Sequence, residues 1–216
     1  MIPELAATEF LDHGSPAIRD FVAKTPGDTT LDKAAALYKA VRDGITYEVY
    51  GADLSREGLR ASNVSQRRSG MCIHKSILYA ATLRAIGVPS RLVFTDVRNH
   101  LASPQLTRLI GGDTFTYHCL VSAQLNGRWV KATPVFNRLL CKLYRIAPLE
   151  FDGTQDSLHH PFDLNGRRHM EFVHEHGEFA DVPYDRLLTG LRAAHPGIFA
   201  TEDTFTTGSL VADATR

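Results

Sequence analysis

The sequence predicts a mixed fold of helices and strands, in which a buried helix packs against an antiparallel sheet. The helix is expected over residues 72–86, where only two side chains carry a charge, so most of its surface must be buried. Two strand-like runs, 116–125 and 128–133, are joined by Asn126-Gly127. Asn-Gly favours a type I′ turn because both residues tolerate a positive φ, and the runs are therefore expected to form a hairpin.

Two capped helices and a polar loop are expected ahead of the buried helix. Ser15 and Thr30 are candidate N-caps, because a hydroxyl group can accept a hydrogen bond from an N–H of the first helical turn. The expected elements are helices over 16–23 and 31–43, an extended piece over 45–50 and a loop over 51–69.

The rest of the chain gives weaker patterns. A strand is expected over 91–96, followed by a connection over 97–115 long enough to act as a lid. The last ~15 residues are rich in Thr, Ala and Gly and are expected to fray. We expect one domain over 1–216, with a core over about 16–137, an extension over 138–196 that packs over the cleft, and a frayed tail over 197–216.

Composition excludes several classes of protein. The 216 residues carry 24 basic and 24 acidic side chains, so no net field favours nucleic acid or an anionic membrane. No stretch reaches the ~18 apolar residues that span a bilayer, and the N-terminus does not resemble a secretory signal. Three cysteines do not make a disulfide framework, and a reducing, cytoplasmic location is expected.

The candidate nucleophile is Cys72, at the point where a loop enters the buried helix. Free N–H groups and the helix dipole at such a terminus favour the thiolate over the thiol. The backbone N–H of Cys72 is also a candidate oxyanion donor. The neighbouring Gly70 lacks a Cβ and would let a substrate carbonyl approach the backbone, with Met71 beside it.

His118 is the candidate base, because a thiolate needs a positioned imidazole that can later protonate the leaving group. It begins the first hairpin strand, which can pack against the Cys72 helix. Cys119 must point to the opposite face of that strand and is expected to be core, as is Cys141. An unreactive buried thiol and a structural histidine are the alternatives for Cys72 and His118.

Four pieces of the chain, in this order, resemble the core of the transglutaminase-like superfamily. They are residues 37–47, Gly70-Met71-Cys72 with the run 78–91, His118, and 127–130 followed by Thr133-Pro134. The resemblance covers about residues 16–137. It implies a papain-like α+β core, in which a central N-terminal helix carrying the cysteine packs on an antiparallel sheet. It also implies a Cys-His-Asp triad and acyl transfer through a thioester.

The chain departs from that family at the third member of the triad. The family has Asp shortly after the Trp, whereas Thr133 follows Trp129 here. A threonine hydroxyl can accept a hydrogen bond from the imidazole, but it supplies no negative charge to stabilise imidazolium. Asn137 is a second candidate for this role, and Asp96 or Asp113 from the long connection are alternatives.

Other residues are candidates for binding. Gln66 precedes the cysteine at a spacing close to that of the oxyanion glutamine in papain-like enzymes. His74 and Tyr117 are expected to line the substrate site. No metal or cofactor is expected, because no nucleotide-binding motif is present and the histidines do not follow a zinc pattern. These histidines are His159, His160, His169, His174 and His176.

Three functions remain open from the sequence. The first is a cysteine-dependent hydrolase or acyltransferase acting on a peptide or small amide-containing substrate. The second is a non-catalytic binding or assembly module, which the loss of the triad Asp favours. The third is acyl transfer from coenzyme A like that of the arylamine acetyltransferases, for which the chain shows no adenine- or pyrophosphate-binding feature.

Overall fold

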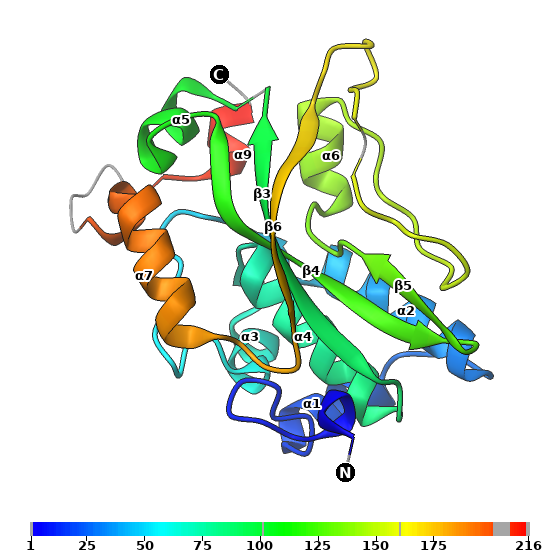
Figure 1. The fold of residues 1–216 in the computed structure, drawn as a ribbon. Helices are drawn as coiled ribbons and strands as arrows, with labels where there is room; N and C mark the ends of the chain where they lie inside the picture. The colour runs from blue at the N-terminus through cyan, green and yellow to red at the C-terminus, as the bar shows by residue number, and fades with distance from the viewer. Residues whose placement is uncertain (1, 101, 160, 201–207, 215–216) are drawn as a thin grey trace.

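A twisted four-stranded sheet divides the molecule, with α4 (Cys72–Ala85) packed behind it and further helices packed around α4 (Figure 1). The computed structural model describes residues 2–100, 102–159, 161–200 and 208–214. The sheet order is β5-β4-β3-β6, and all its pairings are antiparallel. Its strands are β3 (Ser90–Asn99), β4 (Thr114–Leu125), β5 (Arg128–Ala132) and β6 (Met170–Phe179).

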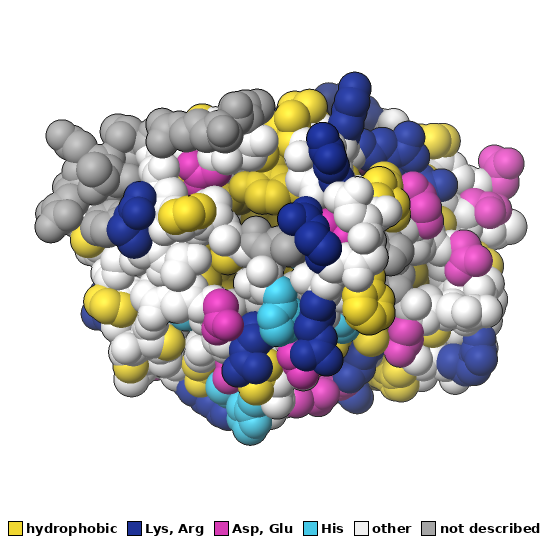
Figure 2. Space-filling view, turned by 90° about the horizontal axis from the view of Figure 1, so that it is seen from above, with side chains coloured by type: hydrophobic (Ala, Val, Ile, Leu, Met, Phe, Trp, Pro, Cys, Tyr) yellow, Lys and Arg dark blue, Asp and Glu magenta, His cyan; other side chains and the backbone are white. Residues whose placement is uncertain are grey.

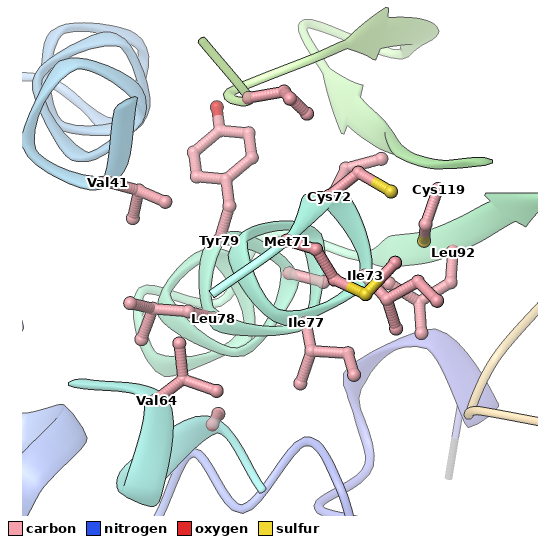
Figure 3. Packing of buried hydrophobic residues seen from close by; sticks show 14 of the residues in the cluster. Val41, Val64, Met71, Cys72, Ile73, Ile77, Leu78, Tyr79, Leu92 and Cys119 are labelled. Atoms are coloured by element: carbon pink, nitrogen blue, oxygen red, sulfur yellow. The ribbon is translucent and has the colours of Figure 1, made fainter. Parts of the chain in front are cut away.

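Helix α4 is the centre of the core, as the sequence predicts. Nearly all of its side chains are buried, and its apolar residues pack against both the sheet and the helices beyond it (Figure 3). The hydroxyl of Ser76 donates to the carbonyl of Cys119 at 2.8 Å, which ties the first turns of α4 to β4. The predicted arrangement of a buried helix on an antiparallel sheet is therefore confirmed.

The predicted hairpin is also confirmed. Asn126 and Gly127 have φ angles of +48° and +76°, as a type I′ turn requires, and they join β4 to β5.

The two N-terminal helices begin close to the predicted positions. In α1 (Pro16–Ala23) the Ser15 hydroxyl accepts from the N–H of Ile18. Helix α2 (Thr30–Gly44) is capped by Thr29 rather than Thr30. The Thr29 hydroxyl accepts from the N–H of Asp32, whose carboxylate accepts from Thr29 in return. This capping box shifts the start of the helix by one residue.

Several elements were not predicted. Helix α3 (Ala61–Arg67) and the short β2 (Ser69–Gly70), which pairs in parallel with β1 (Thr46–Tyr47), lie in the segment expected to be a loop. The connection expected over 97–115 is shortened by longer flanking strands and contains α5 (Pro104–Ile110). The other elements are η1 (Pro3–Leu5), α6 (Arg138–Tyr144), α7 (Tyr184–Ala194), η2 (Pro196–Phe199) and α9 (Leu210–Ala214).

The sheet is irregular where β3 and β4 approach the candidate site. The register shifts between Thr95 and Val97, so that Asp96 alone stands opposite two residues of β4. One of these is Tyr117, whose φ is +60°, a value that a bulky residue rarely adopts. The Asp96 carboxylate accepts from the N–H of Tyr117 at 3.1 Å. A bulge of this kind bends the strand and redirects the side chains that follow it, beginning with His118.

Arg84 joins α4 to three segments that are distant in sequence. Its guanidinium donates to the carbonyl groups of Ala6, Ser90 and Ala180 at 2.6, 2.8 and 2.5 Å, and its side chain is almost fully buried. The residue therefore fixes the N-terminal segment and the ends of β3 and β6 onto the central helix.

Replacing Arg84→Met should lower the free energy of unfolding by about 3 kcal/mol, because it leaves three carbonyl groups without their charged donor. Denaturant unfolding measures this. Arg60→Met, at an exposed position, is the matched control and should change stability by less than about 0.5 kcal/mol. Equal, small effects of the two substitutions would show that Arg84 does not hold these segments.

Candidate active site

Cys72 is the first residue of α4 and has no exposed surface. Its sulfur points toward β4, on the side where Cys119 lies (Figure 3). The backbone N–H of Cys119 lies within reach of this sulfur. The candidate nucleophile therefore lies against β4, beside the residue that follows His118.

Burial raises the pKa of the Cys72 thiol to about 12. Backbone N–H groups of Cys119, Ile73 and Cys72 itself favour the thiolate, as expected at a helix N-terminus, but their effect is smaller than that of burial. Burial therefore works against the predicted thiolate and favours the neutral thiol at rest.

His118 lines a cavity of about 60 Å³ at the end of the sheet and an adjoining one of about 20 Å³. Cys119, the next residue, belongs to the hydrophobic core that includes α4, so the two side chains leave β4 on opposite faces. This confirms Cys119 as a core residue. Tyr47 lines the larger cavity together with His118, whereas Cys72 is not among the residues that line either of these two cavities.

Burial also lowers the pKa of His118 to about 4, with a further small contribution from His159. The imidazole is therefore neutral, like the thiol. With pKa values of about 12 and about 4, moving a proton from Cys72 to His118 would cost on the order of 10 kcal/mol. Burial therefore opposes a thiolate–imidazolium pair in the closed site, and entry of water or substrate would lower this cost.

Two buried threonines lie on the His118 side of the sheet. Thr133 lines the smaller cavity together with His118, while Thr95 is the cross-strand partner of His118 on β3. Each is 5% exposed, and neither hydroxyl has a hydrogen-bond partner among the described residues. Thr133 is held by its main chain, since its N–H donates to Ser157 and its carbonyl accepts from the Tyr38 hydroxyl. Unpaired buried hydroxyls are uncommon in folded proteins, so each of these two needs an explanation.

The other candidates for orienting His118 are engaged elsewhere. The side-chain oxygen of Asn137 accepts from the N–H of Leu140 at 3.0 Å and caps α6. Asp96 binds His176 at 2.6 Å, and Asp113 forms an exposed ion pair with Arg98. These contacts leave Thr133 as the member of the predicted set that shares a cavity with His118.

Gly70 was expected to leave space for a substrate carbonyl, and in the structure the space beside it is occupied by His74. A Cβ placed on Gly70 would lie 2.6 Å from the Cβ of His74, so the space is filled by this side chain and not left open to a substrate. His74 itself is fully buried, and its Nε2 lies 2.9 Å from the carbonyl oxygen of Asp53. Met71, also fully buried, belongs to the core. Gly70 and His74 thus pack the turn that leads into α4.

Gln66 and Tyr117 are placed further from the cavities. Gln66 is exposed on α3. The ring of Tyr117 stacks on that of His176, with centroids 4.0 Å apart, and α7 approaches it through Gly190. A Cβ on Gly190 would come within 2.1 Å of the Tyr117 ring, so this contact depends on glycine. The binding roles of Gln66 and Tyr117 stay predictions.

The larger cavity is mainly apolar, and sequence reasoning missed most of its walls. Figure 2 looks onto this end of the molecule, where hydrophobic side chains lie among basic ones. Val49, in the segment after β1, is apolar, but nothing in the sequence around it indicates that it lines a cavity. The remaining walls come from β1, β3, β4, α5, α6 and segments beyond residue 134, and they include Tyr47, Leu106, Phe115, Phe136, Tyr144, His169 and Leu210.

Among the described C-terminal histidines, His159 and His169 line the smaller cavity together with His118, whereas His176 is bound to Asp96. His160 lies outside the described residues. Among residues with described positions, no group of three or more His, Cys, Asp or Glu side chains is placed to hold a metal ion. Within the same part of the chain, none of the helices has the length and apolar character needed to cross a membrane.

Buried neutral histidines should make the protein unstable in mild acid. The pKa values of His74 and His118 fall to about 4 in the folded chain, against about 6.5 when unfolded. Below pH 6.5 the unfolded chain therefore binds protons that the folded chain does not, and stability is lost as the pH falls toward 4. Between pH 7 and 5 we expect a loss of about 2 kcal/mol for each histidine, measured by denaturant unfolding.

The variant His118→Gln separates this effect from other titrations. It should be less sensitive to pH over the same interval, because one of the imidazoles whose pKa is lowered by burial is gone. A wild-type stability that stays flat between pH 7 and 5 would contradict the neutral, buried state of these side chains.

Comparisons with known proteins give a matching family and a similar solved structure. The profile of the transglutaminase-like superfamily matches residues 18–134. Among solved structures, a candidate cysteine protease from Cytophaga hutchinsonii is similar at 18% identity and a TM-score of 0.45. That alignment covers 62% of this chain and 41% of the other, so the chain spans less than half the length of that protein. No curated protein matches. The profile match covers over half the chain and includes α4, β4 and the hairpin, and the chain belongs to the transglutaminase-like superfamily.

Proposed function

We propose that the protein is a cysteine-dependent acyl-transfer enzyme that uses Cys72 as nucleophile and His118 as base. The observation that supports this proposal is that both residues belong to the same stretch of the α4–β4 contact. The sulfur of Cys72, the first residue of α4, lies within reach of the backbone N–H of Cys119, and His118 is the residue that precedes Cys119 in β4. Superfamily membership supports a fold built for cysteine chemistry.

The neutral resting state sets the order of proton transfers. The Cys72 thiol gives its proton to His118 as the sulfur attacks the substrate carbonyl carbon, since no thiolate exists beforehand. The carbonyl oxygen takes up the electron pair and is stabilised by the Cys72 N–H. His118 then returns the proton to the leaving amine as the C–N bond breaks, and a thioester remains on Cys72. Water or an amine releases the acyl group and restores the thiol.

The substrate class follows from the walls of the cavity. They are mainly aliphatic and aromatic, with His118, His169 and Asn99 among the polar residues. A peptide or small amide that presents an apolar group beside its carbonyl fits such a surface. The reaction favoured is hydrolysis or modification of an amide bond, with transfer to an amine as the alternative outcome of the same thioester.

A second candidate is a binding or assembly module without catalysis. Two observations favour it: Thr133 replaces the carboxylate of the triad, and the buried thiol and imidazole are both neutral. A module of this kind would keep the fold and the cavity, but it would never form a covalent intermediate.

Trapping the acyl-enzyme separates the two candidates. A set of activated thioesters and p-nitrophenyl esters of apolar N-acyl amino acids should add one acyl group to Cys72, detected by intact-mass and peptide mass spectrometry. Cys72→Ser should abolish the adduct, and His118→Ala should slow its formation by about 10²- to 10⁴-fold. Cys141→Ser is the matched control and should leave the rate unchanged. Acylation at equal, slow rates on all three cysteines would favour the binding module.

Thr133 gives a prediction in which stability and activity move in opposite directions. Its hydroxyl is buried without a partner, so Thr133→Val should raise the free energy of unfolding by up to about 1 kcal/mol. If the hydroxyl orients His118, the same change should slow acylation of Cys72 about tenfold. Ser122→Ala, which removes another buried unpaired hydroxyl, is the control for activity. Unchanged acylation by Thr133→Val would remove Thr133 from the catalytic group.

A further inference from the structure

The C-terminal segment (residues 208–214) lies against the wall of the cavity that contains His118. It includes α9, which in Figure 1 lies at the same end of the molecule as α5 and α6. Leu210, at the start of α9, is 3% exposed and lines the cavity together with His118 and Tyr47. The sequence predicts a frayed end here, whereas specific contacts hold residues 208–214 in the structure.

Polar contacts hold the backbone of the segment on both sides of Leu210. The Leu210 N–H donates to the carboxylate of Glu48 at 3.1 Å, and its carbonyl accepts from the Tyr144 hydroxyl at 3.2 Å. Glu48 is itself fixed, since it also accepts from the N–H groups of Val49 and Tyr50. The N–H and the carbonyl of Leu210 are thus both hydrogen-bonded to side chains of other segments, as the backbone of a bound peptide can be.

Asp213 fixes the other end of the segment. Its carboxylate accepts from the Tyr50 hydroxyl at 2.7 Å and from the Ser103 hydroxyl at 3.1 Å. Tyr50 is largely buried, and its ring packs against Gly208, where a Cβ would come within 2.4 Å. The segment therefore presents one apolar side chain to the cavity and one carboxylate, three residues later, to a pair of hydroxyl groups.

We propose that this segment is an intramolecular occupant of the active site, which places Leu210 where an apolar side chain of a peptide substrate binds. The proposal rests on the proposed function in taking the cavity as the substrate site. The bound segment closes one wall of the cavity that His118 lines. Because Cys72 lies against the same stretch of β4, we expect the segment to limit access of water and reagents to the sulfur as well. A peptide with an apolar residue and an acidic residue three positions later matches the same contacts and would displace it.

Access to the Cys72 sulfur tests this directly in the full-length chain. Leu210→Glu places a charge in an apolar cavity and should release the segment. Alkylation of Cys72 by iodoacetamide, followed by peptide mass spectrometry, should then be at least tenfold faster than in the wild type. Leu164→Glu, at a position where the side chain is 69% exposed, is the matched control and should not change the rate.

Cys119 distinguishes release of the segment from unfolding, because it is fully buried against α4. Acceleration at Cys72 alone supports the proposal, whereas equal acceleration at Cys72 and Cys119 overturns it. Amide hydrogen exchange of residues 208–214 shows whether the segment was released. Release without faster alkylation of Cys72 would also overturn it.

A peptide supplied in trans gives a second measurement. An acetylated peptide with the sequence of residues 208–214 should slow alkylation of Cys72 in the Leu210→Glu variant, while the same peptide with Ala in place of its leucine should be at least tenfold less effective. Equal effects of the two peptides, or none, would contradict the assignment of Leu210 to the cavity. Because these readouts report access and not turnover, a segment that protects Cys72 in a protein that forms no acyl-enzyme would refute the proposed function alone.

Discussion

Burial at the N-terminus of α4 sets the protonation state of Cys72, and the rest of the site depends on this constraint. The helix terminus and its N–H groups favour a thiolate, but removal of the sulfur from water is the larger effect, and it raises the pKa to about 12. The same burial lowers the pKa of His118. Burial therefore favours the uncharged form of both side chains, and entry of water would change the balance between their charged and uncharged forms.

The irregular pairing of β3 with β4 explains how β4 contributes side chains both to the core and to the cavity. The bulge opposite Asp96, with Tyr117 at a φ of +60°, redirects β4 before His118. Regular alternation then sends Cys119 into the core and His118 into the cavity. Where the superfamily has a carboxylate, this chain has the hydroxyl of Thr133, which can orient a neutral imidazole without adding a buried charge. That replacement is consistent with a site in which both partners start uncharged.

The parts of the fold that sequence reasoning found are those with strong local signals. The charge-poor run of α4 and the Asn126-Gly127 turn each form the structure that their local sequence favours. Together with His118 they also carry the resemblance to the family. Helix α3 was missed because its buried positions, Ala61, Val64 and Ser65, include few large apolar residues. Strand β6 was missed because Glu and His dominate it, and its pairing with β3 is a long-range contact. Candidates for the site could be predicted only at residues whose side chains are themselves reactive, namely Cys72 and His118. Leu210 and Glu48 have no such signal, since their roles arise from segments that meet only in the folded chain.

The central claim, that Cys72 is a neutral thiol in the closed structure, is tested most directly by titrating it. Thiolate absorbance near 240 nm, taken as the difference between the wild type and Cys72→Ser over pH 6 to 10, reports its ionisation. The account predicts no Cys72 thiolate signal up to pH 9 in the wild type, because the buried sulfur has a pKa of about 12. A thiolate signal already present at pH 7 would contradict the account and would mean that helix terminus and imidazole outweigh burial.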